Sequence, residues 1–332
     1  MKVANHVFEL IGQTPIVKIN KINPNPMAEI YAKIEWFNPM GSLKDRIALK
    51  MIEAAEQEKR LTKDKIILEA TSGNTGIALA WVAALKGYKC VIVMPKNVSE
   101  ECKKILNLLG ADLVFTNTET EAIAKARKIA EDPQYVMTDQ FANDINWKTH
   151  YQTTAQEIWE QTNGKITHFV AGIGTSGTIM GVGRRLKELN PRIQIIGVQP
   201  SKIHSKQQGL LNLKEFCPEI CKVNEAVDEM IMVEDENALR TARDLITKEG
   251  LFAGISSGSA MYGAIQKARE IQRGLIVAIL GDHAFKYLST ELFAQQAEHE
   301  KGGQRGALNT KNTPAAPDYG LNLKKEKVVR EK

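Results

Sequence analysis

Short runs of consecutive apolar residues alternate with longer stretches of helical periodicity from about residue 64 to residue 280. Apolar runs linked by helices are typical of parallel sheets that are covered on both faces. The pattern therefore predicts an α/β fold built from two domains, each a largely parallel twisted sheet flanked by helices. The expected strands are residues 66–68, 90–94, 113–115, 135–137, 168–171, 195–198, 230–233 and 275–280, and the expected helices are 75–86, 121–130, 178–189, 236–249 and 259–272, with a further helix beginning at Ser99.

The net charge of +5 is concentrated at the C-terminal end of the chain. Residues 301–332 hold eight basic and three acidic residues, which leaves 36 of each sign in residues 1–300. A neutral body argues against nucleic-acid binding, because such proteins carry their basic surface on the folded domain. Residues 300–332 are rich in Gly, Pro, Asn and Lys without periodicity, which predicts a basic, disordered tail.

The remaining composition is that of an ordinary globular protein, with 43% apolar and 25% charged residues. No apolar run approaches the roughly 18 residues of a membrane span, and the first residues do not resemble a secretory signal. Four cysteines in 332 residues are too few for a disulfide scaffold. We therefore expect a cytoplasmic protein with reduced thiols, no membrane segment and no metal ion.

Ligands of parallel sheets bind where strands give way to helices, and the first segment of interest is residues 38–46, NPMGSLKDR. Ser42 and Asp45 have the spacing of a capping pair, and apolar residues then follow at helical spacing. Lys44 is thus expected in the first turn of a helix, where the helix dipole disfavours a cation and lowers the lysine pKa. A Schiff-base lysine needs such a lowered pKa, whereas the alternative is a solvated surface lysine.

The second segment is residues 71–76, TSGNTG, between an expected strand and an expected helix. Its glycines permit a close backbone approach, and three hydroxyls and an amide line the turn. Hydroxyls and helix-start N–H groups without a cation form a cradle for a small anion such as a carboxylate. A well-capped tight turn without a ligand is the alternative.

The third segment is residues 172–178, GIGTSGT, which matches the glycine pattern of a dinucleotide site. Gln199 ends the next expected strand, where a ribose-binding protein would have Asp or Glu. The hydroxyls of Thr175, Ser176 and Thr178 suit a single phosphate monoester better than a pyrophosphate.

A serine-hydrolase pattern also occurs at residues 254–258, GISSG. Its downstream partners would be Asp282 and His283, which are adjacent in sequence and therefore poorly placed to act as an orienting acid and a base. We disfavour the hydrolase interpretation. One activated lysine, one phosphate cup and one carboxylate cup are instead what an aldehyde cofactor with a phosphate needs in order to act on an amino acid.

These segments closely resemble the signature segments of the cysteine synthase (O-acetylserine sulfhydrylase) family, and most closely its B-type members. The resemblance runs from residues 12–15 to residues 286–290, and it implies a pyridoxal-phosphate enzyme with the fold of the tryptophan synthase β-subunit (fold type II). It implies that Lys44 forms the Schiff base with the cofactor and that Asn74 binds the cofactor's phenolic oxygen. The phosphate would be held by Gly174, Thr175, Ser176, Gly177 and Thr178, and the substrate carboxylate by Thr71, Ser72, Thr75 and Gln140.

The sequence departs from many members of the family near its end. Those members have a serine that contacts the pyridine nitrogen, and His283 stands at that position here. In B-type members the first serine of the GISSG segment takes this role, which would be Ser256. Relatives that use O-phosphoserine have an arginine near residues 210–212, and this chain has none between Arg192 and Arg240.

The resemblance therefore implies a homodimeric enzyme that makes L-cysteine from an activated serine, with O-acetylserine favoured, and sulfide, by β-replacement through an aminoacrylate. Cysteine desulfhydrase and a cystathionine β-synthase-like reaction are alternatives, and a dinucleotide-binding oxidoreductase is a remote one. The expected domains are residues 8–35 with 148–298, which bind the cofactor phosphate, and the smaller, mobile residues 36–147, which carry the carboxylate loop.

Overall fold

The computed structural model describes residues 3–203, 205–214 and 216–294. The chain up to Ala294 forms one compact unit. The tail expected at residues 300–332 lies outside the described residues.

A sheet of six strands forms one half of this unit, with the strand order β1-β2-β10-β7-β8-β9. β1 is antiparallel to β2, and all other neighbouring strands are parallel. The mainly parallel arrangement agrees with the predicted fold class. The strands are β1 (Ile16–Ile19), β2 (Ala28–Ile34), β7 (His168–Gly172), β8 (Gln194–Pro200), β9 (Glu229–Val233) and β10 (Gly274–Leu280).

A second sheet has four strands in the order β5-β4-β3-β6, all of them parallel. Its strands are β3 (Ile66–Ala70), β4 (Lys89–Pro95), β5 (Asp112–Thr116) and β6 (Tyr135–Met137). β3 to β6 lie inside the segment 36–147, and the strands of the six-stranded sheet lie outside it. The domain boundaries and the mobility of the smaller part stay predictions.

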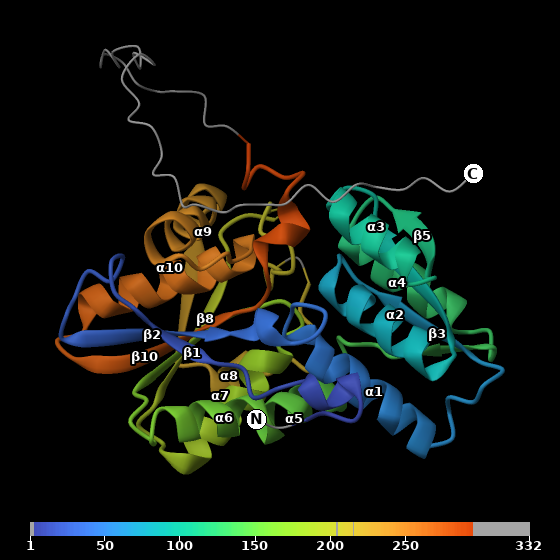
Figure 1. Cartoon of the computed structure of the whole chain (residues 1–332), viewed down its shortest axis with the longest axis horizontal. Coiled ribbons are helices and arrows are strands. Elements are labelled where there is room, and N and C mark those ends of the chain that lie inside the picture. Colours follow the sequence, from blue (N-terminus) through green and yellow to red (C-terminus); the bar gives the residue numbers. More distant parts are fainter. Residues whose placement is uncertain (1–2, 204, 215, 295–332) are drawn as a thin grey trace, which may run out of the picture. The chain divides into compact units, whose positions relative to one another are not determined.

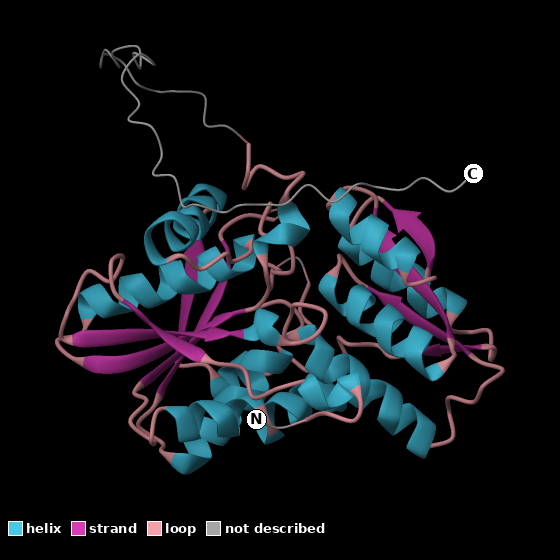
Figure 2. Ribbon diagram, viewed as in Figure 1, coloured by secondary structure: helices cyan, strands magenta, loops and turns pink. Residues whose placement is uncertain are grey.

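Helices cover both faces of each sheet (Figures 1 and 2). α9 and α10 lie on one face of the six-stranded sheet and α6, α7 and α8 on the other, while α4 lies opposite α2 and α3 on the smaller sheet. The helices are α1 (Lys44–Gln57), α2 (Asn74–Lys86), α3 (Glu100–Leu108), α4 (Glu119–Ile129), α5 (Asp144–Gln152), α6 (Thr154–Gln161), α7 (Gly177–Leu189), α8 (Val223–Ala226), α9 (Asp235–Glu249) and α10 (Ile255–Glu270), with short 3-10 helices at η1 (Val7–Leu10), η2 (Glu35–Phe37) and η3 (Ala284–Tyr287).

The apolar runs of the sequence are explained by this covering of both faces. In β3, Ile67 packs in the core shared with α1 and α2, whereas Leu68 packs in the core shared with α4. Successive side chains of a strand point to opposite faces, so a strand between two helical layers is mainly apolar on both faces, and the buried Glu69 of β3 is an exception.

The sequence analysis did not predict strands β1 and β2, helices α5, α6 and α8, or the early start of α10. β1 and β2 are interrupted by charged residues such as Lys33, whose side chain is buried among ion pairs and not in an apolar core. α10 begins at Ile255, earlier than the expected residue 259. Gly258 lies inside this helix. A glycine is needed there because a Cβ would lie 2.2 Å from the Ala238 carbonyl oxygen of α9.

Candidate active site

The described part of the chain contains a cavity of about 710 Å³, into which the three segments singled out in the sequence converge. The loops that follow β3, β7 and β10 all contribute to its lining, as expected for the carboxyl ends of parallel strands. Of the predicted site residues, Gly177 is absent from the lining. Those that line the cavity are Lys44, Thr71, Ser72, Asn74, Thr75, Gln140, Gly174, Thr175, Ser176, Thr178 and Ser256.

Lys44 is the first residue of α1, and burial lowers its pKa from 10.5 to about 8 against the opposing effect of the Glu69 carboxyl. No hydrogen bond or ion pair of its amine is found among residues 3–294 as described. A half-buried amine with this pKa is partly uncharged near neutral pH, and an uncharged amine is nucleophilic and basic.

The turn before Lys44 is held differently from a standard capping box. Ser42 Oγ accepts a hydrogen bond from the Lys44 backbone N–H at 3.2 Å, and Asp45 accepts one from the Met40 N–H at 2.6 Å. Ser42 and Asp45 do interact, at 3.4 Å, but the helix N-cap residue is Leu43. The Leu43 N–H donates to the Gly281 carbonyl oxygen, so the turn is tied to the end of β10.

The loop of residues 71–76 is joined to Gln140 from the loop after β6. Thr75 Oγ1 donates to Gln140 Oε1 at 2.6 Å, and Gln140 Nε2 donates to the Ala70 carbonyl oxygen at 2.8 Å. Thr71 Oγ1 accepts from the Gly73 N–H at 3.1 Å. Hydroxyl and amide groups from two loops are thus gathered at one side of the cavity, without a basic side chain inside this cluster.

Glu69 supports this pair of loops, and the sequence analysis did not single it out. It is fully buried in β3, and its carboxyl group accepts hydrogen bonds from the Thr138 hydroxyl and from the Gln140 N–H. Burial raises its pKa to about 8 in spite of these hydrogen bonds. The available sequence signal was an acidic residue at the end of an otherwise apolar strand.

The loop of residues 172–178 presents unsatisfied donors to the cavity. Ser176 has a left-handed backbone (φ 70°) and is the N-cap of α7, and its buried hydroxyl has no partner among the described residues. The backbone N–H groups of Gly174, Thr175 and Ser176 likewise have no acceptor in the described ranges. The start of a long helix and unpaired N–H groups together favour an anion.

Asn146 of α5 couples this loop to Gln140 and was missed by the sequence analysis. Its Nδ2 donates to the Gln140 carbonyl oxygen at 2.8 Å and to Thr175 Oγ1 at 2.9 Å. A Cβ at Gly177 would lie 1.9 Å from Asn146 Oδ1. Glycine is therefore required at 177 to admit Asn146, and Gly177 supports the loop from behind.

Ser256 and His283, the two candidates for a ring-nitrogen contact, differ in position. Ser256 lines the cavity in the first turn of α10. The His283 ring packs against Trp36, Phe252 and Phe285, with centroid distances of 5.8, 5.3 and 4.4 Å. His283 does not line the cavity, and its Nδ1 accepts a hydrogen bond from the Phe285 N–H, so Ser256 remains the candidate and His283 is not placed as a base for it.

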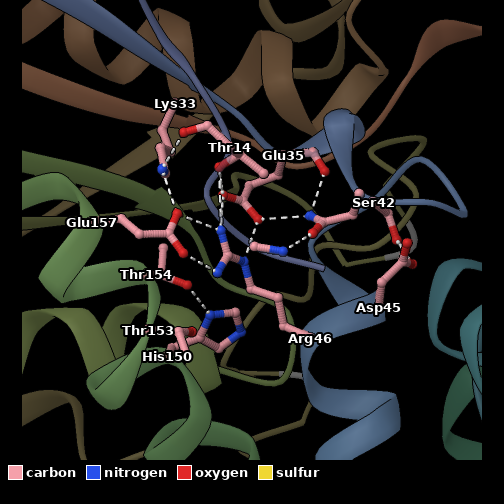
Figure 3. A network of polar contacts seen from close by, with 12 residues as sticks. Thr14, Lys33, Glu35, Ser42, Asp45, Arg46, His150, Thr153, Thr154 and Glu157 are labelled. Atoms are coloured by element: carbon pink, nitrogen blue, oxygen red, sulfur yellow. Dashed lines mark hydrogen bonds and ion pairs between the residues drawn. The ribbon is translucent and has the colours of Figure 1, made fainter. Parts of the chain in front are cut away.

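A buried ion-pair cluster lies beside the first turn of α1 (Figure 3). Arg46 donates two hydrogen bonds to Glu35, at 2.8 and 3.0 Å, and two to Glu157, at 2.6 and 2.8 Å. Lys33 also donates to Glu157, at 2.7 Å. Burial alone would raise the pKa of Glu157, but the two cations lower it to about 2.

His150 connects the ion-pair cluster with the loop of residues 172–178. Its Nδ1 lies 2.9 Å from Thr154 Oγ1 and its Nε2 lies 3.3 Å from Thr178 Oγ1. Burial and the nearby positive charges of Arg46 and Lys44 hold its pKa well below 6.5. The imidazole is therefore neutral at physiological pH and can orient the Thr178 hydroxyl.

The position of the Gln199 side chain does not support a dinucleotide site, where this residue would have to contact a ribose. Its buried side chain accepts a hydrogen bond from the Leu213 N–H at 3.0 Å, and its Nε2 donates to the Met232 sulfur at 3.1 Å. It stabilises the segment after β8 and does not line the cavity.

Comparison with known proteins decides the family. The model of the pyridoxal-phosphate dependent enzyme family matches residues 7–282. The chain is 44% identical over 307 residues to cysteine synthase of Aquifex aeolicus, which covers 89% of this chain and 94% of the relative. The chain belongs to the cysteine synthase family of pyridoxal-phosphate dependent enzymes.

The B-type resemblance and the fold are supported in the same way. The chain is 41% identical over 297 residues to cysteine synthase B of Salmonella typhimurium, covering 88% of this chain and 97% of the relative. A solved hydrogen sulfide-producing enzyme from Fusobacterium nucleatum has a TM-score of 0.81 and 38% identity, covering 86% of this chain and all of that chain. The expected family, fold class and cofactor are thereby confirmed.

The residues of the cavity fit pyridoxal phosphate. Its phosphate needs several donors, and the orphaned Ser176 hydroxyl and the unpaired N–H groups of residues 174–176 supply them. Its aldehyde needs an amine that is partly uncharged, and Lys44 has a pKa of about 8. Both requirements are met within one cavity.

No helix among the residues described is long and apolar enough to cross a membrane.

Proposed function

We propose that this protein is a cysteine synthase that makes L-cysteine from O-acetylserine and sulfide by β-replacement. The observation that carries the proposal is the convergence of Lys44, a donor-rich phosphate loop and a separate hydroxyl-and-amide loop on one cavity. The chain aligns with relatives named cysteine synthase over 94% and 97% of their length, which supports the same reaction.

The cofactor supplies an aldehyde carbon for an amine and a conjugated ring that withdraws electrons from the substrate. We assign the phosphate to the N–H and hydroxyl groups of residues 174–178, and the phenolic oxygen to Asn74. Ser256 is the proposed contact of the ring nitrogen. A neutral hydroxyl leaves that nitrogen largely unprotonated, which limits electron withdrawal and favours loss of the β-substituent over a long-lived carbanion.

Lys44 is the proposed attachment point of the cofactor and the base for the substrate α-proton. With a pKa of about 8, its amine accepts a proton near neutral pH and can return it. Thr71, Ser72, Thr75 and Gln140 are the proposed ligands of the substrate carboxylate. Hydroxyl and amide donors can hold this anion without placing a second cation next to the Lys44 amine, where it would alter the pKa.

Replacement of Lys44 by alanine tests the proposal. We expect Lys44→Ala to lose the visible absorption of the bound cofactor and to lose cysteine synthesis, because the proposed attachment point and base are removed. The matched control is Lys50→Ala on the exposed side of the same helix, where the lysine forms an ion pair with Glu53. Retention of full activity by Lys44→Ala would refute the proposed role.

The leaving group is tested by mixing the holoenzyme separately with O-acetylserine, O-phosphoserine, serine and cysteine. We expect O-acetylserine to change the visible spectrum fastest and to support sulfide consumption. A cysteine desulfhydrase is the second candidate, because a structural relative is a hydrogen sulfide-producing enzyme. Release of sulfide from cysteine at a higher kcat/KM than sulfide consumption would favour that candidate, and homocysteine acceptance would favour the cystathionine β-synthase-like reaction.

We further propose that the enzyme is a cytoplasmic homodimer whose residues 36–147 close over the amino acid. All four cysteines are free thiols, which is compatible with a reducing compartment. Light scattering of the holoenzyme would measure the oligomeric state. Small-angle scattering with and without substrate would measure the closure.

A further inference from the structure

The segment that follows β10 places two buried ionic side chains beside Asn74. Asp282 is 1% exposed and lies just before η3, and Lys286 is 6% exposed and lies within it. Asp282 accepts a hydrogen bond from Asn74 Nδ2 at 2.7 Å, and Lys286 Nζ donates to Asn74 Oδ1 at 2.6 Å. The Asn74 amide is thus held between a carboxylate and an ammonium group.

This arrangement permits only one orientation of the amide. An ammonium group has donors and no acceptor, so the Asn74 atom facing Lys286 must be the carbonyl oxygen. A carboxylate only accepts hydrogen bonds, as Asp282 Oδ2 also does from the Tyr287 hydroxyl, so the Asn74 atom facing it must be a donor. A rotated amide would place its NH₂ against the ammonium and its oxygen against the carboxylate, with both hydrogen bonds lost.

The clamp leaves the second N–H of Asn74 without a charged acceptor. The NH₂ group has two hydrogens: Asp282 Oδ2 accepts one at 2.7 Å, and the Tyr287 hydroxyl, whose own hydrogen goes to Asp282, also interacts with the amide. Asn74 lines the cavity. We propose that Asp282 and Lys286 are positioning residues that hold the Asn74 amide with its remaining N–H available to an acceptor oxygen of the bound cofactor, an inference that rests on the proposed function of Asn74.

The same segment also holds the turn that precedes Lys44. Lys286 Nζ donates to the Gly41 carbonyl oxygen at 3.3 Å, and the Leu43 N–H donates to the Gly281 carbonyl oxygen at 2.9 Å. Lys286 therefore connects the turn before Lys44 with the side chain of Asn74. A lysine at 286 is placed to couple the two cofactor-binding segments.

The test is a double-mutant cycle in which each cofactor-depleted variant is titrated with pyridoxal phosphate for its apparent affinity and, once loaded, is scanned for its visible absorption maximum. We expect Lys286→Met to weaken the affinity roughly tenfold and to shift the maximum, because a charge-assisted hydrogen bond is lost. Lys286→Arg keeps a donor and should retain both properties. Asp282→Asn should weaken the affinity roughly threefold, since a neutral amide replaces a charged acceptor.

The decisive comparison is made in the Asn74→Ala background. There, adding Lys286→Met should change the affinity by less than about threefold, because of the two described contacts of Lys286 with the cofactor-binding segments only the long hydrogen bond to the Gly41 carbonyl oxygen remains. The control Lys187→Met, which removes a lysine paired with Asp228 away from the cavity, should leave both readouts unchanged. Urea unfolding of each variant reports general loss of stability separately from cofactor affinity.

An equal effect of Lys286→Met with and without Asn74 would overturn the inference, as would an unchanged affinity in both Lys286→Met and Asp282→Asn. An Asn74→Ala variant with normal affinity and spectrum would overturn it together with the assigned role of Asn74. Failure of the unmodified protein to bind pyridoxal phosphate would instead refute the proposed function.

Discussion

Glu69 shows how a single buried group can support the site without touching the cavity. Its carboxyl group joins the end of β3 to the loop that carries Gln140. With a pKa of about 8, it is mostly protonated at neutral pH in the folded protein. In the unfolded chain it loses its proton near its ordinary value of 4.5.

This difference in pKa predicts that Glu69→Gln increases the free energy of unfolding, by an amount that depends on pH. Between pH 4.5 and 8 the Glu69 carboxyl group carries a proton in the folded state but not in the unfolded state. The contribution of Glu69 to the stability of the folded state is therefore complete below about pH 4.5 and is lost as the pH rises to about 8. A glutamine cannot ionise. Relative to the unmodified protein, Glu69→Gln should therefore gain up to about 1.4 kcal/mol of unfolding free energy per pH unit within this window.

Urea unfolding at several pH values between 5 and 8.5 measures this gain. Glu29→Gln, in which a partly exposed glutamate of β2 is changed, is the control and should follow the unmodified protein. Parallel pH profiles for Glu69→Gln and the unmodified protein would contradict the prediction.

Among the elements, α1 depends most on interactions that lie outside its own sequence. Its first turn carries Lys44 towards the cavity and Arg46 into the buried ion-pair cluster. Arg46 and Glu35 are 2% and 0% exposed, so neither can be solvated if the other is removed. The position of the Lys44 turn is therefore coupled to η2 and α6 by buried charge.

We expect Arg46→Met to reduce the free energy of unfolding by about 3–5 kcal/mol, because Glu35 is left buried without its partner. Arg185→Met, which removes a partly exposed partner of Glu188, should cost no more than about 1 kcal/mol. Denaturant midpoints of the two variants provide the comparison. Similar midpoints would show that the buried cluster adds no more than a surface pair.

Strands β3 to β10 could be predicted from the sequence, whereas β1 and β2 could not. Strands β3 to β10 are apolar at consecutive positions because helices cover both faces, and that property is visible in the sequence. β1 and β2 lack it: Val17 is exposed, and the buried Lys33 is neutralised by a residue 124 positions further along the chain. No local pattern encodes such a partner.

For the whole molecule, charge and function are separated along the chain. Residues 1–300 are neutral, and the excess of five positive charges belongs to residues 301–332. The relatives align over 87–89% of this chain while covering 94–98% of their own length. Among the described residues, those that line the cavity end at Glu291.

A chain that ends at residue 300 should therefore bind pyridoxal phosphate with the same affinity and absorption maximum. It should also elute earlier from a cation exchanger, because five net positive charges are removed. Cofactor titration and ion-exchange chromatography check the two statements. Loss of cofactor binding would show that the tail contributes to the site.

By itself, the sequence determined the α/β class, the cofactor family and the residues gathered at the strand ends, because backbone periodicity and glycine-rich turns are local properties. Only the tertiary structure decided that His283 packs among aromatic rings, that Gly177 makes room for Asn146, and that Lys286 and Asp282 hold Asn74. Each of these depends on side chains distant in sequence meeting in a buried space. Their partners are set by packing and by the need to satisfy every buried charge and hydrogen-bonding group.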